Sequence, residues 1–291
     1  MKIIHFSDIH IGYKDKEYSN KYSVADDRFS LIIDNLQVKL EELNKLEQHE
    51  YVIIITGDLV NQAGHIDDDD GGYQNYKIIK DKLTKLNNNG FKNILIIPGN
   101  HDYYKPYLYA DQTLVQVFQD NFWGFTQEPA LTENYPRLNI INNVAFIGLD
   151  SMSAESGPIE SWGAEGDFGQ AQRERLTDLL NNSAAIKNCT HRVIYFHHNP
   201  FENNYWHKLR DSEEFTDLLK SYNDTHANKK VDLLLFGHTH NAQKYHGNCE
   251  IPRCYEAGST TRKLCMPGIH RLIDIESPSK DIDLDLHGNY F

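Results

Sequence analysis

The chain has 291 residues, of which 40% are hydrophobic and 24% charged, as in an ordinary soluble globular protein. Its 29 basic and 42 acidic residues give a formal net charge of −13, which repels phosphate backbones, so extended nucleic-acid binding is not expected. No apolar run reaches the about 18 residues of a membrane span, and no signal-peptide pattern opens the chain. We therefore expect a cytoplasmic protein without membrane contact.

The cysteines exclude two common classes of small cysteine motif. The chain has four, Cys189, Cys249, Cys254 and Cys265, and no two of them form a CxxC pair. A zinc ribbon and a thioredoxin-like motif are therefore excluded, and reduced structural thiols are expected. A turn could still bring Cys249 and Cys254 together, so a disulfide between them stays open.

The first hundred residues alternate between short apolar strands and amphipathic helices. The apolar runs at residues 2–7, 51–56 and 93–97 predict strands, and the spacing of apolar residues predicts helices at 24–46 and 73–86. This alternation indicates right-handed crossovers and a largely buried sheet.

The second half repeats the theme less regularly. Strands are expected at residues 144–149, 193–196 and 231–236, with helices at 170–180 and 211–222. Short strands at 242–245, 251–257 and 270–275 are typical of an antiparallel sheet. Because no linker rich in Pro, Gly or Ser divides the chain, we predict one α/β domain over residues 1–291, with two sheets packed face to face. Residues 281–291 would form a C-terminal tail or an edge strand.

Polar clusters follow five of the predicted strands, at the point where each strand ends. Ligand sites in open α/β sheets form at this edge. The clusters are Asp8-Ile9-His10, Gly57-Asp58, Gly99-Asn100-His101-Asp102, His197-His198 and Gly237-His238-Thr239-His240.

These clusters have the composition of a metal site. Residues i and i+2 of an extended strand end point to the same side, so Asp8 can converge with His10, and His238 with His240. Asp58 could bridge two ions through its two oxygens, and Asn100 would offer an amide oxygen. Imidazole with carboxylate suits Mn, Fe, Zn, Ni or Co. Each cluster alone could be a turn or a helix cap, but their joint placement predicts metal binding.

The order DxH, GD, GNHD, H and GHxH resembles the calcineurin-like metallophosphoesterase superfamily over roughly residues 1–275. Four further segments are similar to the class III cyclic nucleotide phosphodiesterases: FIGLD at 146–150, Gly-Gln-Ala-Gln at 169–172, His-His-Asn-Pro at 197–200 and Gly-Ser-Thr at 258–260. Asn199 departs from the His-His-Pro of that group. The resemblance implies a four-layer α/β/β/α sandwich of two mixed β-sheets flanked by helices.

The resemblance also divides the ligands between two divalent or trivalent ions. One ion would take Asp8, His10, Asp58 and His240, and the other would take Asp58, Asn100, His197 and His238. His198, next to a ligand, is expected to point the other way in a supporting role. His101 is the candidate general acid, and Asp102 would orient His101 or a neighbouring loop.

The expected activity is hydrolysis of a phosphoester by hydroxide attack on phosphorus at two metal ions, with a nucleotide or small phosphodiester as substrate. The alternatives are a phosphomonoesterase, including a protein serine/threonine phosphatase, and, against the acidic charge, a nuclease. A non-enzymatic scaffold is disfavoured because none of the seven ligands is missing. The oligomeric state stays open. The expected pocket walls are Tyr13, Asn61, His65, Tyr103, Tyr104, the 151–167 loop with Trp162, and the 199–208 segment with Trp206.

Overall fold

The first sheet contains five strands, three of them parallel. The structure, a computed structural model, describes residues 1–13, 25–43, 50–61, 63, 73–103, 112–152, 164–204, 207–245, 248–261 and 269–286. In the order of the sheet the strands are β11 (Ile282–Asp285), β10 (Ile269–Asp274), β1 (Lys2–Phe6), β2 (Tyr51–Thr56) and β3 (Asn93–Ile97). β1, β2 and β3 run parallel, whereas β10 is antiparallel to β1 and β11 is antiparallel to β10.

The second sheet contains six strands with an antiparallel strand at each edge. Its order is β4 (Arg137–Ile141), β5 (Val144–Gly148), β6 (His191–Tyr195), β7 (Leu233–Phe236), β9 (Arg253–Glu256) and β8 (Lys244–Tyr245). The four central strands are parallel, and β4 and β8 are antiparallel to their neighbours.

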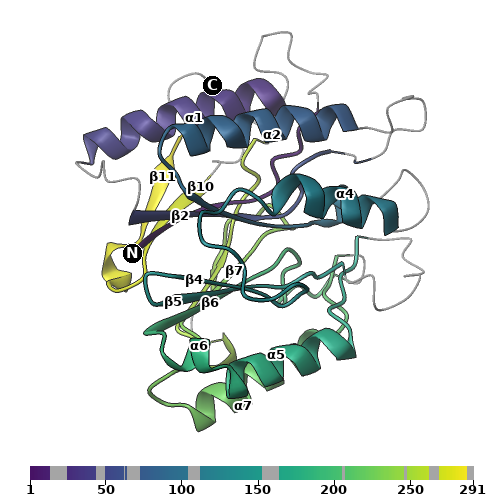
Figure 1. Cartoon of the computed structure of the whole chain (residues 1–291), viewed down its shortest axis with the longest axis vertical. Coiled ribbons are helices and arrows are strands. Elements are labelled where there is room, and N and C mark those ends of the chain that lie inside the picture. Colours follow the sequence, from purple (N-terminus) through teal and green to yellow (C-terminus); the bar gives the residue numbers. More distant parts are fainter. Residues whose placement is uncertain are drawn as a thin grey trace.

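Helices cover the outer face of each sheet, so the molecule has four layers (Figure 1). The first sheet carries α1 (Ala25–Glu42), α2 (Tyr73–Asn88) and α4 (Gln112–Phe122), and the second carries α5 (Gln170–Asn182), α6 (Ala184–Lys187) and α7 (Ser212–Thr225). Short helical turns occur at α3 (Asn100–Tyr103), η4 (Asn248–Glu250) and η5 (Pro278–Lys280). The predicted sandwich of two mixed sheets flanked by helices is confirmed.

The central strands are buried on both faces, and alternate residues serve two different cores. Along β2, Val52 and Ile54 pack between the two sheets, while Ile53 and Ile55 pack under the helices of the first sheet. This division follows from the two-residue period of a strand, and it explains why the sequence of β2 is apolar throughout. The two sheets are thus held together by side chains of the inner core.

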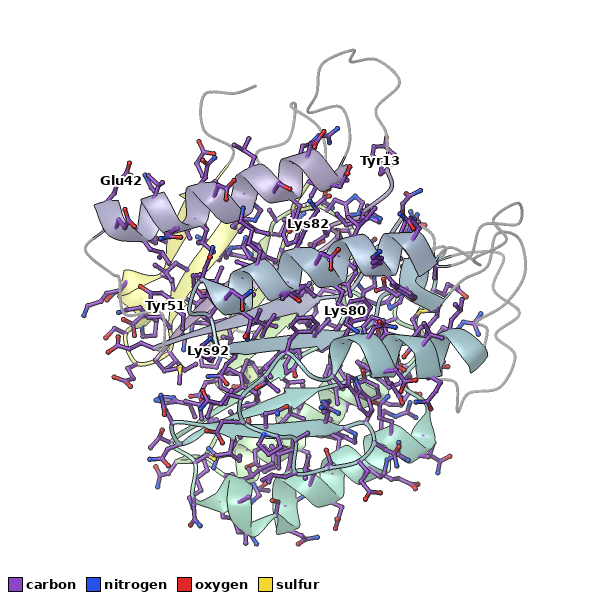
Figure 2. All side chains as sticks on the ribbon, turned by 45° about the horizontal axis from the view of Figure 1, so that its top comes forward. Tyr13, Glu42, Tyr51, Lys80, Lys82 and Lys92 are labelled. Carbon is purple, nitrogen blue, oxygen red and sulfur yellow. The ribbon has the colours of Figure 1, made fainter. Side chains whose placement is uncertain are left out.

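Polar contacts tie the helices of the first layer to one another. Lys82 of α2 points toward α1, where its Nζ lies 2.5 Å from the Ser30 hydroxyl, and Lys80 reaches Asn121 of α4 at 3.2 Å (Figure 2). The Lys80 contact is exposed and the Lys82 contact is partly buried, and each of them joins two helices of this layer. None of the helices that the structure describes is both long and apolar enough to cross a membrane.

Two parts of the sequence prediction need correction. The segments 242–245, 251–257 and 270–275 do not form one antiparallel sheet: β8 and β9 extend the second sheet, β9 is parallel to β7, and β10 joins the first sheet beside β1. Strand β4 and helix α4 were not predicted. The first error concerns which strands pair with one another. Strand pairing depends on contacts between distant segments, and local periodicity carries no information about those contacts.

Cys189, Cys249 and Cys254 are thiols in the structure. Burial raises the pKa of Cys249 to about 11 and that of Cys254 to about 12, so both thiols stay protonated near neutral pH. Cys265 lies outside the described residues. The geometry therefore matches the expected structural thiols and leaves no disulfide between Cys249 and Cys254.

Shortening a side chain of the inner core tests how far the fold depends on it. Ile54 is fully buried between the sheets, so Ile54→Ala should lower the free energy of unfolding by about 2–5 kcal/mol, measured by urea titration. Val38 of α1 is 54% exposed and serves as the control. Val38→Ala should change the free energy of unfolding by less than about 0.5 kcal/mol. Equal effects of the two substitutions would contradict the assignment of Ile54 to the core.

Candidate metal centre

All seven predicted ligands lie together at the C-terminal ends of strands from both sheets. Asp8 and His10 follow β1, Asp58 follows β2, and Asn100 begins α3 just after β3. His197 follows β6, and His238 and His240 follow β7. Six of the seven are buried, and His240 is half-buried. The strand ends of two sheets therefore meet at one polar centre inside an apolar sandwich.

The first set of side chains comprises Asp8, His10 and His240. His240 Nε2 lies 3.0 Å from Asp8 Oδ1 and 3.3 Å from His10 Nε2. His10 Nε2 is 3.8 Å from the same Asp8 oxygen. One small cation could contact all three atoms.

The second set comprises Asn100, His197 and His238. His197 Nε2 lies 3.1 Å from Asn100 Oδ1 and 3.2 Å from His238 Nδ1. Two loops of the second sheet and one loop of the first sheet contribute to this set. Apart from Asp58, the two sets contain the same residues as the two groups of ligands that the sequence predicted for two ions.

Asp58 stands between the two sets. Its Oδ2 lies 3.8 Å from His10 Nε2 of the first set and 3.4 Å from His197 Nε2 of the second. Its other oxygen, Oδ1, accepts the backbone N–H of His101 at 2.9 Å. We expected two ions to share both oxygens, whereas the structure turns one oxygen toward both sets and fixes the other in a hydrogen bond.

A backbone carbonyl selects the tautomer of His197. The Nδ1–H of His197 donates to the carbonyl of Thr56 at 2.7 Å, so Nε2 is the nitrogen that faces Asp58 and Asn100 and is left to bind a cation. The Ser7 hydroxyl donates to the same carbonyl at 3.1 Å. Sequence reasoning missed Thr56 because a main-chain acceptor has no side-chain signature.

The electrostatics favour charged carboxylates beside the imidazoles. Burial by itself raises the pKa of Asp8, but the adjacent His240 lowers it to about 2. Burial acts likewise on Asp58, whose pKa lies well below the usual range because of His197 and His101. Burial opposes the charged form of His197, yet the charge and hydrogen bond of Asp58 raise its pKa to about 9. The two carboxylates therefore stay ionised and attract cations.

Five of the predicted ligands adopt a strained backbone. Ten described non-glycine residues have a positive φ, and half of them are predicted ligands. Their φ angles are 53° for Asp8, 51° for His10, 52° for Asp58, 79° for His238 and 63° for His240. Such conformations cost about 1–3 kcal/mol each and concentrate at functional sites. The fold thus holds these residues in place at the expense of local stability.

The chemistry of the donor set fits divalent cations. Two carboxylates, one amide oxygen and four imidazoles are ligands that Mn, Fe, Zn, Ni or Co accept. The Nε2 atoms of His10 and His240, 3.3 Å apart, would repel each other as two lone pairs unless a proton or a cation lay between them. The geometry therefore suits a metal, while the role of each ligand stays a prediction.

His101 and Asp102 follow Asn100 but serve different contacts. His101 Nδ1 lies 2.5 Å from the Asn61 carbonyl, and its ring meets His10 edge-on at 4.8 Å between centroids. The Asp102 carboxylate accepts backbone N–H groups of Leu59, at 3.0 Å, and of Gly99, at 2.9 Å. Of the two alternatives predicted for Asp102, the contacts match the orientation of neighbouring loops and not of His101.

His198 lies in the cluster and does not point away from it as expected. Its ring centroid is 4.3 Å from that of His238, and its Nδ1 is 2.7 Å from the Ser151 hydroxyl. Burial holds the pKa of His198 well below the usual value, so the ring is neutral. The turn after β6 places both imidazoles of the His197-His198 pair near His238.

A cavity of about 250 Å³ adjoins the first set. It is lined by His10, Tyr13, Asn61, His101, His240, Ser259 and Thr261. Tyr13 lies beside the N-terminal end of α1 (Figure 2), and both Tyr13 and Asn61 were expected as pocket walls. Tyr103 was expected there too, but it is fully buried in the core under the helices. His65, Tyr104, Trp162 and Trp206 lie outside the described residues.

The segment after β9 fastens the loop that carries Asp8. Ser259 Oγ donates to the Asp8 carbonyl at 2.7 Å, and the backbone N–H of Ser7 donates to Thr260 Oγ1 at 3.1 Å. The backbone N–H of Thr260 in turn donates a hydrogen bond to the Ser7 carbonyl at 2.9 Å. The sequence motif Gly-Ser-Thr was noted, but its structural role required the tertiary contact.

Gly99 tests whether the position of Asp58 controls metal binding. A Cβ on Gly99 would overlap Asp58 Oδ1 and lie 2.5 Å from the Asp58 backbone nitrogen. Gly99→Ala should therefore displace the shared carboxylate and weaken Mn²⁺ binding by about 10–100-fold, measured by titration calorimetry. At Gly124 a Cβ meets nothing within 4 Å, so Gly124→Ala should bind Mn²⁺ normally. Normal binding by Gly99→Ala would disprove the assignment.

Comparison with known proteins identifies the family of the chain. No curated protein sequence matches the chain significantly. Similar solved structures include phosphopantetheinyl hydrolase from Mycobacterium tuberculosis (11% identity, TM-score 0.39, 89% of each chain covered) and the sulfate thiohydrolase SoxB from Thermus thermophilus (11%, 0.45, 100% of this chain and 57% of that one). Zinc-bound Vps29 from Entamoeba histolytica is another (12%, 0.32, 98% and 99%). The sequence pattern of the calcineurin-like phosphoesterases matches residues 1–242, so the chain belongs to the calcineurin-like phosphoesterase family.

Proposed function

We propose that the protein is a dinuclear metallophosphoesterase that hydrolyses a small phosphodiester such as a nucleotide derivative. The observation that carries the proposal is the position of Asp58 Oδ2, which faces imidazoles of both ligand sets, at 3.8 Å from His10 Nε2 and 3.4 Å from His197 Nε2. A carboxylate in this position suits two neighbouring cations better than one. Membership of the family supplies the reaction class, hydrolysis of phosphoester bonds.

The metal ions would be held as the sequence predicted, with Asp58 common to both sites. When bound, such ions would offset negative charge on the phosphoryl oxygens and lower the pKa of the attacking water. The chain's own contribution is rigid placement. The Thr56 carbonyl orients His197, the Ser259 hydroxyl fixes the Asp8 loop, and Asp102 fixes the turns around Asp58 and Gly99.

His101 is the proposed general acid. The Asn61 carbonyl accepts its Nδ1 proton, which leaves Nε2 as the nitrogen available to a leaving group in the cavity that this ring lines. The edge-on contact with His10 keeps the ring beside the first ligand set. In its imidazolium form, with a proton on each nitrogen, His101 would donate the Nε2 proton to the departing alkoxide and keep the Nδ1 proton on the Asn61 carbonyl.

The cavity favours a diester over a monoester. Its described lining contains three imidazoles, hydroxyls and an amide, and none of these described residues is Lys or Arg. A monoester dianion would place its extra charge on the metal ions alone, whereas a diester carries a single charge. The hydroxyl of Tyr13 offers a hydrogen bond to a polar leaving group such as a sugar, whereas the hydroxyls of Ser259 and Thr261 already donate to the carbonyls of Asp8 and Ile9.

Other parts of the proposal rest on the sequence. They are closeness to the class III cyclic nucleotide phosphodiesterases, the choice of ion among Mn, Fe, Zn, Ni and Co, a small phosphoester as the substrate, and a cytoplasmic location. A phosphomonoesterase or protein serine/threonine phosphatase is the alternative activity.

Removal of His101 should separate substrates by their leaving groups. His101→Ala should lower kcat by about 10²–10⁴ on an alkyl phosphodiester, because the alkoxide would leave unprotonated. On bis-nitrophenyl phosphate the loss should be much smaller, since nitrophenolate is a stable anion. Both rates are measured at saturating Mn²⁺, with metal content checked. An equal loss on the two substrates would remove His101 as the acid.

A paired substrate assay tests the preference for diesters. The Mn²⁺-loaded protein should hydrolyse bis-nitrophenyl phosphate with a higher kcat/KM than mono-nitrophenyl phosphate, and chelation by EDTA should abolish both activities. Cyclic nucleotides belong in the same panel. A higher kcat/KM on the monoester would favour the phosphatase alternative, and activity unaffected by EDTA would overturn the metal mechanism.

A further inference from the structure

A buried carboxylate outside the ligand set lies behind the histidines of the second sheet. Glu256 is the last residue of β9 and has 0% of its surface exposed. Because β9 pairs in parallel with β7, Glu256 is in register with Phe236, the residue just before the Gly237–His240 loop. The side chain of Glu256 can therefore reach that loop.

One oxygen of Glu256 holds the residue between two predicted ligands. The hydroxyl of Thr239 donates to Oε1, and the backbone N–H of Asn241 approaches the same oxygen at 3.5 Å. Thr239 separates His238 from His240, both of which have a positive φ. With the Thr239 side chain held toward β9, the two flanking imidazoles turn into the metal centre. The bond thus opposes relaxation of a strained loop.

The other oxygen of Glu256 holds the loop that carries His197. Asn199 Nδ2 donates to Oε2 at 3.1 Å, and the Tyr245 hydroxyl lies 3.5 Å from the same atom. Asn199 is itself buried, and its Oδ1 accepts the Phe201 N–H at 2.8 Å, so its orientation is fixed. Asn199, the departure from the family's His-His-Pro, is therefore the residue that connects this loop to Glu256.

We propose that Glu256 is a positioning residue that sets the distance between the His197 loop and the His238–His240 loop. The inference rests on the dinuclear site proposed above. A carboxylate suits the position because it only accepts hydrogen bonds, and donors approach both of its oxygens. A neutral amide of the same shape would turn its NH₂ group either against the Asn199 amide donor or toward Thr239, where the hydroxyl bond would have to reverse and the NH₂ would face the Asn241 N–H. Glu256 acts through Asn199 and Thr239, and within the described part of the chain its side chain makes no hydrogen bond to a predicted ligand side chain.

Two isosteric substitutions test the proposal through metal binding. Glu256→Gln and Thr239→Val should each weaken Mn²⁺ binding by about 10–100-fold in titration calorimetry. Both substitutions break the same hydrogen bond between Thr239 and Glu256. The double variant should therefore bind Mn²⁺ with about the affinity of whichever single variant has the lower affinity. High Mn²⁺ should restore kcat in all three, because the substituted side chains do not touch substrate.

Asn223 provides a matched control in the same half of the molecule. It is fully buried, accepts the Val231 N–H at 2.8 Å and donates to the Glu250 carbonyl at 3.2 Å. Asn223→Asp should lower the melting temperature and leave the Mn²⁺ affinity unchanged.

The outcomes separate the two proposals. If Glu256→Gln and Thr239→Val behave like Asn223→Asp, with lower stability and normal Mn²⁺ affinity, the positioning role is overturned. Should Glu256→Gln fail to fold, Thr239→Val decides alone. A wild-type protein that binds two Mn²⁺ ions but cleaves no phosphoester would reject the proposed function and leave this test valid. Wild-type protein without Mn²⁺ binding would overturn both.

Discussion

The hydrogen bond from His197 to the carbonyl of Thr56 connects the two sheets at the point where the ligands meet. It joins the end of β6 in one sheet to the end of β2 in the other over 2.7 Å. Asp58 lies two residues beyond Thr56, so the same turn that supplies the acceptor also supplies the shared carboxylate. The candidate metal centre therefore forms only where both sheets are packed together, and the inner core that holds the sheets is a condition for the site.

The centre is locally unfavourable, and the surrounding structure compensates for it. Two carboxylates, Asp8 and Asp58, are almost fully buried, and five predicted ligands have a left-handed backbone. Backbone N–H groups and imidazoles surround the two carboxylates: His238 N–H donates to Asp8 Oδ2 at 3.1 Å, and His101 N–H donates to Asp58 Oδ1 at 2.9 Å. Unpaired, such charges would cost several kcal/mol each. The burial of these two charged carboxylates therefore requires the hydrogen bonds that the surrounding loops provide.

What could be predicted from the sequence depended on whether the information was local. The cluster of candidate ligands could be predicted because each segment combines side chains of metal-binding type with the end of an apolar strand. Helix α4 also has a local signal in the sequence. Its apolar residues Leu114, Phe118 and Phe122 recur every four residues, as on one face of a helix, and they are buried. By contrast, the pairing of β10 with β1, the burial of Tyr103 and the acceptor role of the Thr56 carbonyl depend on contacts between distant segments. No periodicity encodes these.

The acidic charge of the chain gives the metal centre a second role under the proposed function. A protein with a formal net charge of −13 repels an anionic phosphoester. The described lining of the cavity adds no Lys or Arg to reverse that field. Bound cations would then be the main source of attraction for the substrate as well as of catalysis. Residues that only hold the ligands in place, Glu256 and Asp102 among them, consequently affect substrate binding through the metal, although neither lines the cavity.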